Sequence, residues 1–559
     1  MKSIKPIGLI TMMICFLVFP ISVSGVVYVN KNATGANNGN SWTDAYTTIQ
    51  AGIDDADVAD EEVWVVQETY LESIVMKSGV KLYGGFNGTE TELNQRNWTM
   101  NVTTIDASTA RGGLPAYHVV IMDSITNATI DGFSITGGNA NGGGTNDGGS
   151  GFFCYNLNDT NMIKNNIISG NSATASGGGI DCYSSSPAIT NNIISGNSAD
   201  WWGGGIDCYD SSSPAITNNT ISGNSAYYGG GIDCSGSSPA ITNNTISGNS
   251  ADDGGGIWCS YSSPEITNNT ITGNSAYYGG GIDCYDSSPA ITNNTISGNS
   301  ANYRGGGIWC YDNSSPAITN NTISGNSAST YGGGIYCWSN SSPLIKNNIF
   351  SNNNKYDIYE YDTSSDPMVS YNDFYGNPNG IYYDEGTTPY TSVSAMDSAI
   401  AECSNNIGLD PLFVGDTLSG GSWTASSVYN SATFQTTLTD SFASWTPDEH
   451  SGRLLNPDTS QKRQFVIVSN TVTTMTVWGN VTTIAQIGDA YKIFDYHLQL
   501  ASPCIDAGYD QGVPDSDFDG EPRPMDVLSV DNNGLLEEYD IGADEYPGEL
   551  PAISDWVLY

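Results

Sequence analysis

The chain of 559 residues carries 16 Lys and Arg against 59 Asp and Glu, which gives a formal net charge of −43. A surface of this sign repels phosphate backbones and anionic membranes, so the composition argues against nucleic acid as a partner and favours cations. Glycine is frequent, at 65 residues, and charged residues make up only 13%, which is untypical of a helical enzyme. A hydrophobic content of 38% is enough to bury a core, so disorder is not expected.

Residues 1–25 have the layout of a secretory signal peptide. Lys2 and Lys5 precede an apolar run from Ile7 to Phe19, and small residues follow. The run is too short to span a bilayer comfortably, and no later stretch is long and apolar enough to be a membrane helix. We therefore predict an exported, monomeric protein, extracellular or on the cell envelope, with no membrane span in the mature chain. Disulfides are permitted there.

The predicted elements divide the chain into seven segments. In chain order they are a signal peptide (1–25), an N-terminal cap with irregular first coils (26–148), regular repeats (149–345), irregular final coils (346–415), an inserted β-rich segment (416–494), an acidic module (495–546), and a linker or truncated sorting signal (547–559). In the cap, Ala45, Ile49 and Ile53 indicate a short amphipathic helix. Such a helix covers the first coil, whose exposed strand edges otherwise invite aggregation.

The regular segment repeats one motif: Asn-Asn-Thr-Ile-Ser-Gly-Asn-Ser-Ala, a variable loop, Gly-Gly-Gly-Ile-x-Cys, then Ser-Ser-Pro-Ala-Ile. Cysteine marks the period, with steps of 25 to 28 residues, at Cys154, Cys182, Cys208, Cys234, Cys259, Cys284, Cys310 and Cys337. Each unit holds three short apolar runs, for example around Ile216, Ile221 and Ile232, separated by Gly, Asn and Pro. Three short strands joined by tight turns form one coil of a parallel β-helix, so the predicted fold class is all-β, a β-helix solenoid.

Stacked coils place identical residues above one another. The second Asn of each Asn-Asn pair is expected at a corner, with left-handed backbone angles and an amide ladder: Asn192, Asn219, Asn244, Asn269, Asn294 and Asn321. Cys follows Ile at i+2, so both point inward, and we interpret the thiols as small buried hydrophobes, with interlocking disulfides or metal as alternatives. Cys403 and Cys504 lie outside this column and are a candidate disulfide pair.

The residue between Ile and Cys is predicted to point outward. This column, called the stripe, reads Asp181, Asp207, Asp233, Trp258, Asp283, Trp309 and Tyr336. Rings and carboxylates on one outer surface are typical of sugar-binding faces, so we expect the stripe to bind a polysaccharide or cell-surface glycan. The alternative is that aromatic residues there only favour strands and cover glycine-rich backbone.

The same stripe supplies the candidate catalytic residues. If the protein is an enzyme, Asp207, Asp233 and Asp283 are paired carboxylates and Arg304 is the basic group. Stacked carboxylates repel one another, so they should bind a cation or have raised pKa values. Lys164 and Arg304 are the only basic residues of the repeats, and no complete catalytic set is found. Near-identical turns favour a non-enzymatic adhesin or scaffold, with a lyase or glycoside hydrolase on acidic polysaccharide as the alternative.

The strongest local ion motif lies in the acidic module. Asp515, Asp517 and Asp519 alternate before Gly520, and Asp526 occupies the twelfth position. Carboxylates on alternate residues followed by a Gly turn are how a loop wraps Ca²⁺. We predict calcium binding there, and the alternative is a solvated acidic turn.

The Gly-Gly-Gly-Ile and Asn-x-Ile-x-Gly-Asn units resemble right-handed parallel β-helix proteins of the pectin-lyase-like superfamily. In the style of their repeats they resemble polymorphic outer-membrane proteins. The runs 502–508, 519–524 and 540–546 resemble the choice-of-anchor Q module of bacterial surface proteins, and 550–556 resembles the opening of a C-terminal sorting signal. The resemblance implies a right-handed solenoid at the cell surface. It does not select an activity, because this fold hosts lyases, hydrolases and adhesins.

Overall fold

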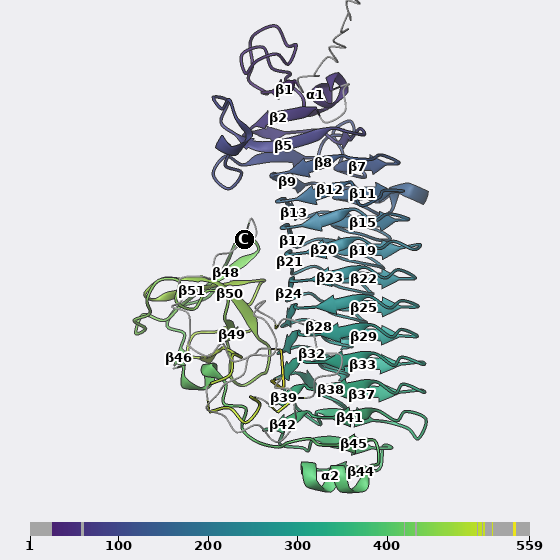
Figure 1. The fold of residues 1–559 in the computed structure, drawn as a ribbon. Helices are drawn as coiled ribbons and strands as arrows, with labels where there is room; N and C mark the ends of the chain where they lie inside the picture. The colour runs from purple at the N-terminus through teal and green to yellow at the C-terminus, as the bar shows by residue number, and fades with distance from the viewer. Residues whose placement is uncertain are drawn as a thin grey trace, which may run out of the picture.

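A computed structural model describes residues 25–56, 61–418, 420–430, 433–499, 501–505, 507–508, 517 and 540–543. Within these residues, three long sheets of fourteen, thirteen and twelve strands run along one solenoid, and a seven-stranded antiparallel sheet lies beside it (Figure 1). The strands of the three long sheets pair in parallel, except for the last strand of the thirteen-stranded sheet. The predicted all-β parallel β-helix is confirmed, and so is the β-rich segment near the C-terminus.

One regular coil contains β22 (Ile232–Ser235), β23 (Ala240–Thr242) and β24 (Thr245–Ser247). Each strand is short because Pro, Asn or Gly ends it within a few residues. The strands pair in register with the next coil, so Ile232 pairs with Ile257 and Cys234 with Cys259. The core therefore consists of columns of identical side chains about 4.8 Å apart.

The cysteine column is buried and unbridged. All ten cysteines of the described residues are free and buried, which agrees with their interpretation as small core residues. The candidate disulfide between Cys403 and Cys504 is not formed. Cys403 lies in β45 (Cys403–Ser404) and packs in the main core, whereas Cys504 belongs to a separate cluster and its thiol contacts the Asp373 carboxylate at 3.5 Å.

The predicted asparagine ladder is present. The amide of Asn269 donates to the carbonyl of Ile241 at 2.8 Å and to Oδ1 of Asn294, one coil on, at 3.0 Å. The left-handed angles fall one residue earlier than expected, for example at Asn268 with φ 56°. The first Asn makes the turn, and this leaves the second free to point inward. The Ser-Gly-Asn corner forms a second ladder that the sequence analysis did not assign, in which Asn249 bonds Asn274 at 3.0 Å.

Short helices lie at both ends of the solenoid (Figure 1). The predicted cap is α1 (Ile49–Asp55). Thr48 caps its N-terminus, and Ile49 and Ile53 are buried against the first strands. At the other end, α2 (Val393–Ala399) follows β44 (Thr388–Tyr390). In the described part of the chain, no helix is long and apolar enough to cross a membrane.

The antiparallel domain, residues 420–494, has its own core around Trp423, Leu455 and Ile467. Its strands, in sheet order, are β46 (Gly421–Ser422), β52 (Ala490–Phe494), β49 (Leu454–Asn456), β50 (Phe465–Asn470), β51 (Thr474–Trp478), β48 (Gln435–Thr439) and β47 (Val428–Asn430).

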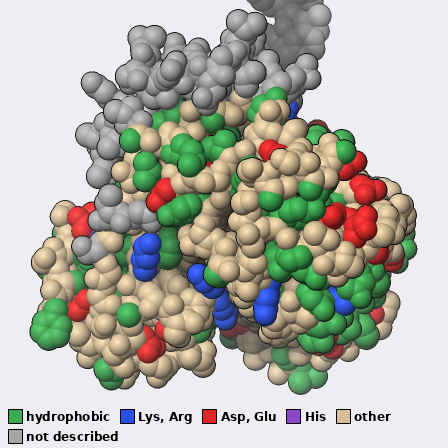
Figure 2. All heavy atoms as spheres, turned by 90° about the horizontal axis from the view of Figure 1, so that it is seen from below, with side chains coloured by type: hydrophobic (Ala, Val, Ile, Leu, Met, Phe, Trp, Pro, Cys, Tyr) green, Lys and Arg blue, Asp and Glu red, His purple; other side chains and the backbone are tan. Residues whose placement is uncertain are grey.

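The domain docks on the glycines of the Ser-Gly-Asn corners. Arg463 Nη2 donates to the Gly273 carbonyl at 2.8 Å, and a Cβ on Gly298 would lie 2.5 Å from the backbone nitrogen of Gln464. On the face that Figure 2 shows, several Lys and Arg side chains lie near the junction of the solenoid and the antiparallel domain. Because glycine has no side chain, these corners let the domain approach the solenoid backbone closely.

Candidate functional site

The stripe predicted from the repeats is buried. Asp207, Asp233 and Asp283 are 3%, 0% and 0% exposed. Their side chains do leave the coil, as strand alternation requires, but the first glycine of the triplet that precedes each Asp in the same repeat lies against it. A Cβ on Gly279 would lie only 2.6 Å from the Cβ of Asp283. The prediction of an exposed stripe is wrong for all of its members: Asp181, Asp207, Asp233, Trp258, Asp283, Trp309 and Tyr336.

The cover over the stripe is the corner arm, defined here as the segment between the Ser-Ala pair and the glycine triplet of each repeat. Its last two residues form the tip, and they are residues 175–176, 201–202, 227–228, 252–253, 277–278, 303–304 and 330–331. The ring of Tyr228 stacks on Trp258 of the following coil at 4.4 Å, and Tyr278 stacks on Trp309 at the same distance. Aromatic residues on the repeats therefore pack on one another, which is the alternative that the sequence left open.

Burial sets the electrostatics of the stripe carboxyls. It raises the pKa of Asp181 to about 7, and it raises the pKa of Asp207 and Asp233 well above the ordinary value. Asp207 and Asp233 each have one carboxyl oxygen without a hydrogen-bond partner. Covered in this way, the carboxyls cannot reach a polymeric substrate, so their candidate catalytic role is not supported. Across the described residues, no group of three His, Cys, Asp or Glu is arranged to hold a metal.

Arg304 is not placed as a base beside these carboxyls. Its guanidinium lies 4.5 to 5.8 Å from the centres of five rings: Tyr303, Tyr331, Tyr336, Trp338 and Tyr361. Contacts of this kind hold a cation by the negative faces of the rings. Arg304 therefore forms part of the aromatic packing of the corner arms.

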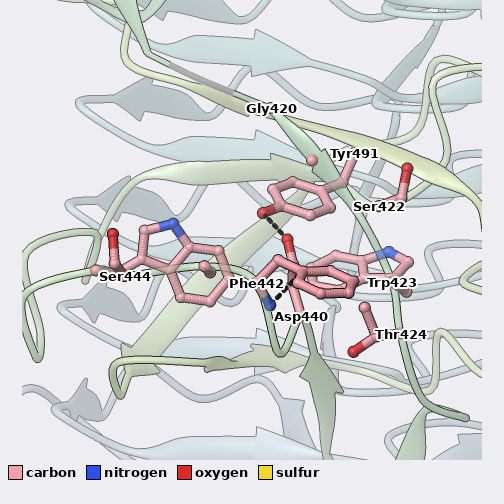
Figure 3. A pocket seen from close by; sticks show the side chains of 11 residues that line it. Gly420, Ser422, Trp423, Thr424, Asp440, Phe442, Ser444 and Tyr491 are labelled. Carbon is pink, nitrogen blue, oxygen red and sulfur yellow. Dashed lines mark hydrogen bonds between the residues drawn. The ribbon is translucent and has the colours of Figure 1, made fainter.

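A pocket of about 470 Å³ lies in the antiparallel domain, which places it within the usual size range for small-ligand sites (Figure 3). Three separate parts of the chain form it: residues 420–424 at β46, the loop 440–445 after β48, and Tyr491 on β52. Antiparallel pairing brings them together, because β46 pairs with β52 through Gly421 and Tyr491.

Stacked rings and one carboxylate form the inner part of the pocket. The rings of Trp423 and Tyr491 stack at 4.2 Å, and the Trp423 indole donates to the Pro457 carbonyl at 2.8 Å. The Tyr491 hydroxyl donates to Asp440 Oδ2 at 2.8 Å, and burial with this bond raises the pKa of Tyr491. Gly421 is required here, because a Cβ would lie 2.5 Å from the Tyr491 hydroxyl.

The rim of the pocket is apolar and exposed. Phe442 is 89% exposed, and its backbone N–H donates to Asp440 Oδ1 at 3.0 Å, which fixes the loop. Trp445 is half-buried and packs edge-on against Tyr491 at 6.1 Å. Ser422, Thr424 and Ser444 add hydroxyls to the lining, and Asp440 is its one charged residue.

Sequence reasoning missed this pocket. Its rings lie far apart in the chain and follow no motif spacing. The local hints in the sequence were the Gly-Gly-Ser-Trp run that ends at Trp423 and the Ser-Trp pair that ends at Trp445. The predicted calcium motif is not placed, because Asp515, Asp519 and Asp526 lie outside the described residues, while Asp517 is buried. The predicted signal peptide lies outside them too, apart from Gly25.

Comparison with known proteins identifies the family. The model of the right-handed beta helix region matches residues 75–296 and 230–398. The chain belongs to this right-handed β-helix family. No curated protein matches it.

Solved structures resemble this β-helix protein at low identity. The XylC–xylose complex is 11% identical, covering 93% of this chain and 98% of its own, with a TM-score of 0.40. The tailspike protein gp49 of Acinetobacter baumannii bacteriophage Fri1, a capsular polysaccharide depolymerase, is 11% identical over 85% of both chains, with a TM-score of 0.31. The pectin methylesterase of Aspergillus niger is 12% identical over 69% of this chain and 91% of its own, with a TM-score of 0.18.

Proposed function

We propose that this β-helix protein binds neutral carbohydrate through the pocket of its antiparallel domain, and acts as an exported adhesin or scaffold. One observation carries the proposal: a pocket of about 470 Å³ combines four aromatic side chains with a single carboxylate and no basic group in its lining. Such a lining fits an uncharged, hydroxyl-rich ligand and disfavours a uronate, whose carboxylate would face Asp440.

The chemistry of the lining suits a sugar ring. Phe442 and Trp445 offer ring surface at the rim, on which the C–H face of a sugar can pack. Each oxygen of Asp440 already accepts one hydrogen bond, from Tyr491 or from the Phe442 backbone. A carboxylate offers about four acceptor positions, but Asp440 is only 5% exposed, so the exposed hydroxyls of the lining make the first contacts with a sugar. Ser422 and Ser444 supply further donors and acceptors.

The lining supports retention of the sugar rather than its cleavage. Glycoside hydrolysis generally needs two carboxyl groups on either side of the scissile bond, and a lyase needs a base beside the sugar carbon. Asp440 is a single carboxylate, and both of its oxygens are engaged in holding the loop and Tyr491. Export to the cell surface rests on the charged and apolar pattern of residues 1–25.

The test uses the full mature chain and a panel of immobilised neutral and acidic polysaccharides, with mass analysis of the supernatant. Retention on a neutral polysaccharide without released oligosaccharides is expected. Trp445→Ala and Phe442→Ala should each weaken retention about tenfold, at the upper end of what one ring contact contributes. Trp201→Ala is the matched control, because this indole is 49% exposed on the solenoid, and it should bind as the unmodified protein does. Equal retention by all variants, or release of cleaved products, would overturn the proposal.

A further inference from the structure

A second cluster of rings and carboxyls lies at the corner-arm tips, away from the pocket. Successive tips stack in register: Asp253 pairs with Tyr228 of the preceding coil and with Tyr278 of the following one. The outer tip residues follow the same order, because Asp252 N donates to the Tyr227 carbonyl and Tyr277 N to the Asp252 carbonyl, both at 2.9 Å. An acidic tip thus lies between two tyrosine tips.

The two tyrosine tips are built alike. Tyr227 and Tyr228 pack edge-to-face at 4.6 Å, and Tyr277 and Tyr278 do so at 4.7 Å. Tyr227 and Tyr277 are 40% and 46% exposed. They lie two coils apart, which separates their backbones by about 10 Å. In the coil between them, the outer tip residue is Asp252, whose side chain is short. The two tyrosine pairs therefore lie on either side of its carboxylate.

A buried carboxyl beneath this tip has no partner. Asp283 is 0% exposed, and neither of its oxygens makes a hydrogen bond. Its register neighbours are Trp258 and Trp309, whose indole N–H groups are also unpartnered. Burial raises the pKa of Asp283, and the charge of Asp253 raises it further. The charge of Asp252 thus acts on Asp253 and that of Asp253 on the buried Asp283, and none of the three forms a salt bridge with a Lys or Arg of the described residues.

The corner arm of another coil contains a cation of its own. Two coils further on, the tip residue Arg304 places its guanidinium among five rings within 5.8 Å. That tip therefore shows that these stacked aromatic positions accommodate a positive charge supplied by the chain itself. The tip 252–253 also lies between aromatic rings. It carries two carboxylates where the other tip carries a guanidinium, so it has no positive charge of its own.

We propose that the tip 252–253, flanked by Tyr227 and Tyr277, binds an ammonium group of an amino sugar in a deacetylated polysaccharide. Carboxylates and ring faces together recognise organic ammonium groups, and the exposed tyrosine rings can pack on the sugar that carries the group. A bare metal ion fits less well, because rings rather than oxygen ligands surround the carboxylates. This site is separate from the domain pocket and does not depend on the proposed function.

The test is calorimetric titration of the full chain with a glucosamine oligomer and with an N-acetylglucosamine oligomer of equal length, at neutral pH and fixed ionic strength. In the Trp445→Ala chain, which lacks the pocket rim, the glucosamine oligomer should bind and the acetylated one should not. The double variant Asp252→Asn, Asp253→Asn should lose at least tenfold in affinity, and Tyr277→Ala should weaken binding independently of charge. Circular dichroism should show both variants folded, because the tips are at the surface.

Two controls make the result decisive. Asp286→Asn removes an exposed carboxylate from another loop and should leave the affinity unchanged. Trp445→Ala removes the pocket rim and should also leave it unchanged, so failure of this site and failure of the pocket are distinguishable. Equal loss on Asp286→Asn, equal binding of the acetylated oligomer, or equally tight binding of a lysine oligomer would overturn the proposal.

Discussion

Replacing Asp181 with Asn tests whether the stripe carboxyls are buried as described. Asp181 is 6% exposed, and burial raises its pKa to about 7 from an ordinary 3.8. A group whose pKa rises on folding adds stability that is complete below pH 3.8 and is lost as the pH rises through about 7. Asn has the same shape and carries no charge, so Asp181→Asn removes this loss.

The expected magnitude follows from the two pKa values. At about 1.4 kcal/mol per pH unit, the difference corresponds to at most about 4 kcal/mol above pH 7. The variant should therefore match the unmodified protein near pH 4 and exceed its free energy of unfolding near pH 8. The hydrogen bond that the Ser176 hydroxyl donates to this carboxyl, at 3.3 Å, can be kept by the Asn side chain.

Urea unfolding followed by circular dichroism at several pH values measures the effect. Asp286→Asn is the control, because this exposed side chain should leave the pH profile of stability unchanged. If Asp181→Asn loses stability with rising pH as steeply as the unmodified protein does, the carboxyl is not buried as described and the reasoning fails.

Three further substitutions test other contacts. Asn269→Ala leaves buried backbone groups in two coils unpaired, so urea unfolding should show a loss of about 3 kcal/mol, and a loss below about 1 kcal/mol would contradict a working ladder. Gly421→Ala crowds the Tyr491 hydroxyl, and should abolish glycan retention while the melting temperature falls little; retained binding would speak against the pocket geometry. Arg463→Ala removes the bonds to the Gly273 carbonyl, about 2 kcal/mol for a charged donor, so calorimetry should show the antiparallel domain melting earlier. An unchanged transition would refute that docking contact.

Repetition made the solenoid predictable from the sequence. The Ile and Cys positions recur every 25 to 28 residues, so their inward direction follows from alternation, and the amide ladder follows from stacking. The apolar spacing of Ala45, Ile49 and Ile53 likewise indicated the cap. These features depend on local spacing and on contact with an identical neighbouring coil, which the sequence displays directly.

The candidate sites were less predictable, for two physical reasons. Alternation gives the direction of the Asp283 side chain but not what covers it, and the covering residues lie in the variable loop that repeats least. The pocket joins Trp423, Asp440 and Tyr491 through antiparallel pairing across a long loop, and no sequence spacing records that pairing. Only the three-dimensional register of β46 and β52 brings these side chains together.

We propose that a neutral glycan occupies the pocket of the antiparallel domain. Hydrogen exchange of the full chain, measured by mass spectrometry with and without the polysaccharide that it retains, tests this directly. The loop 440–445 is exposed in part and forms the rim of the pocket. Bound glycan should therefore slow its exchange at least severalfold, while the stripe of the solenoid stays unchanged. Protection confined to the solenoid, or none at all under saturating glycan, would contradict the claim.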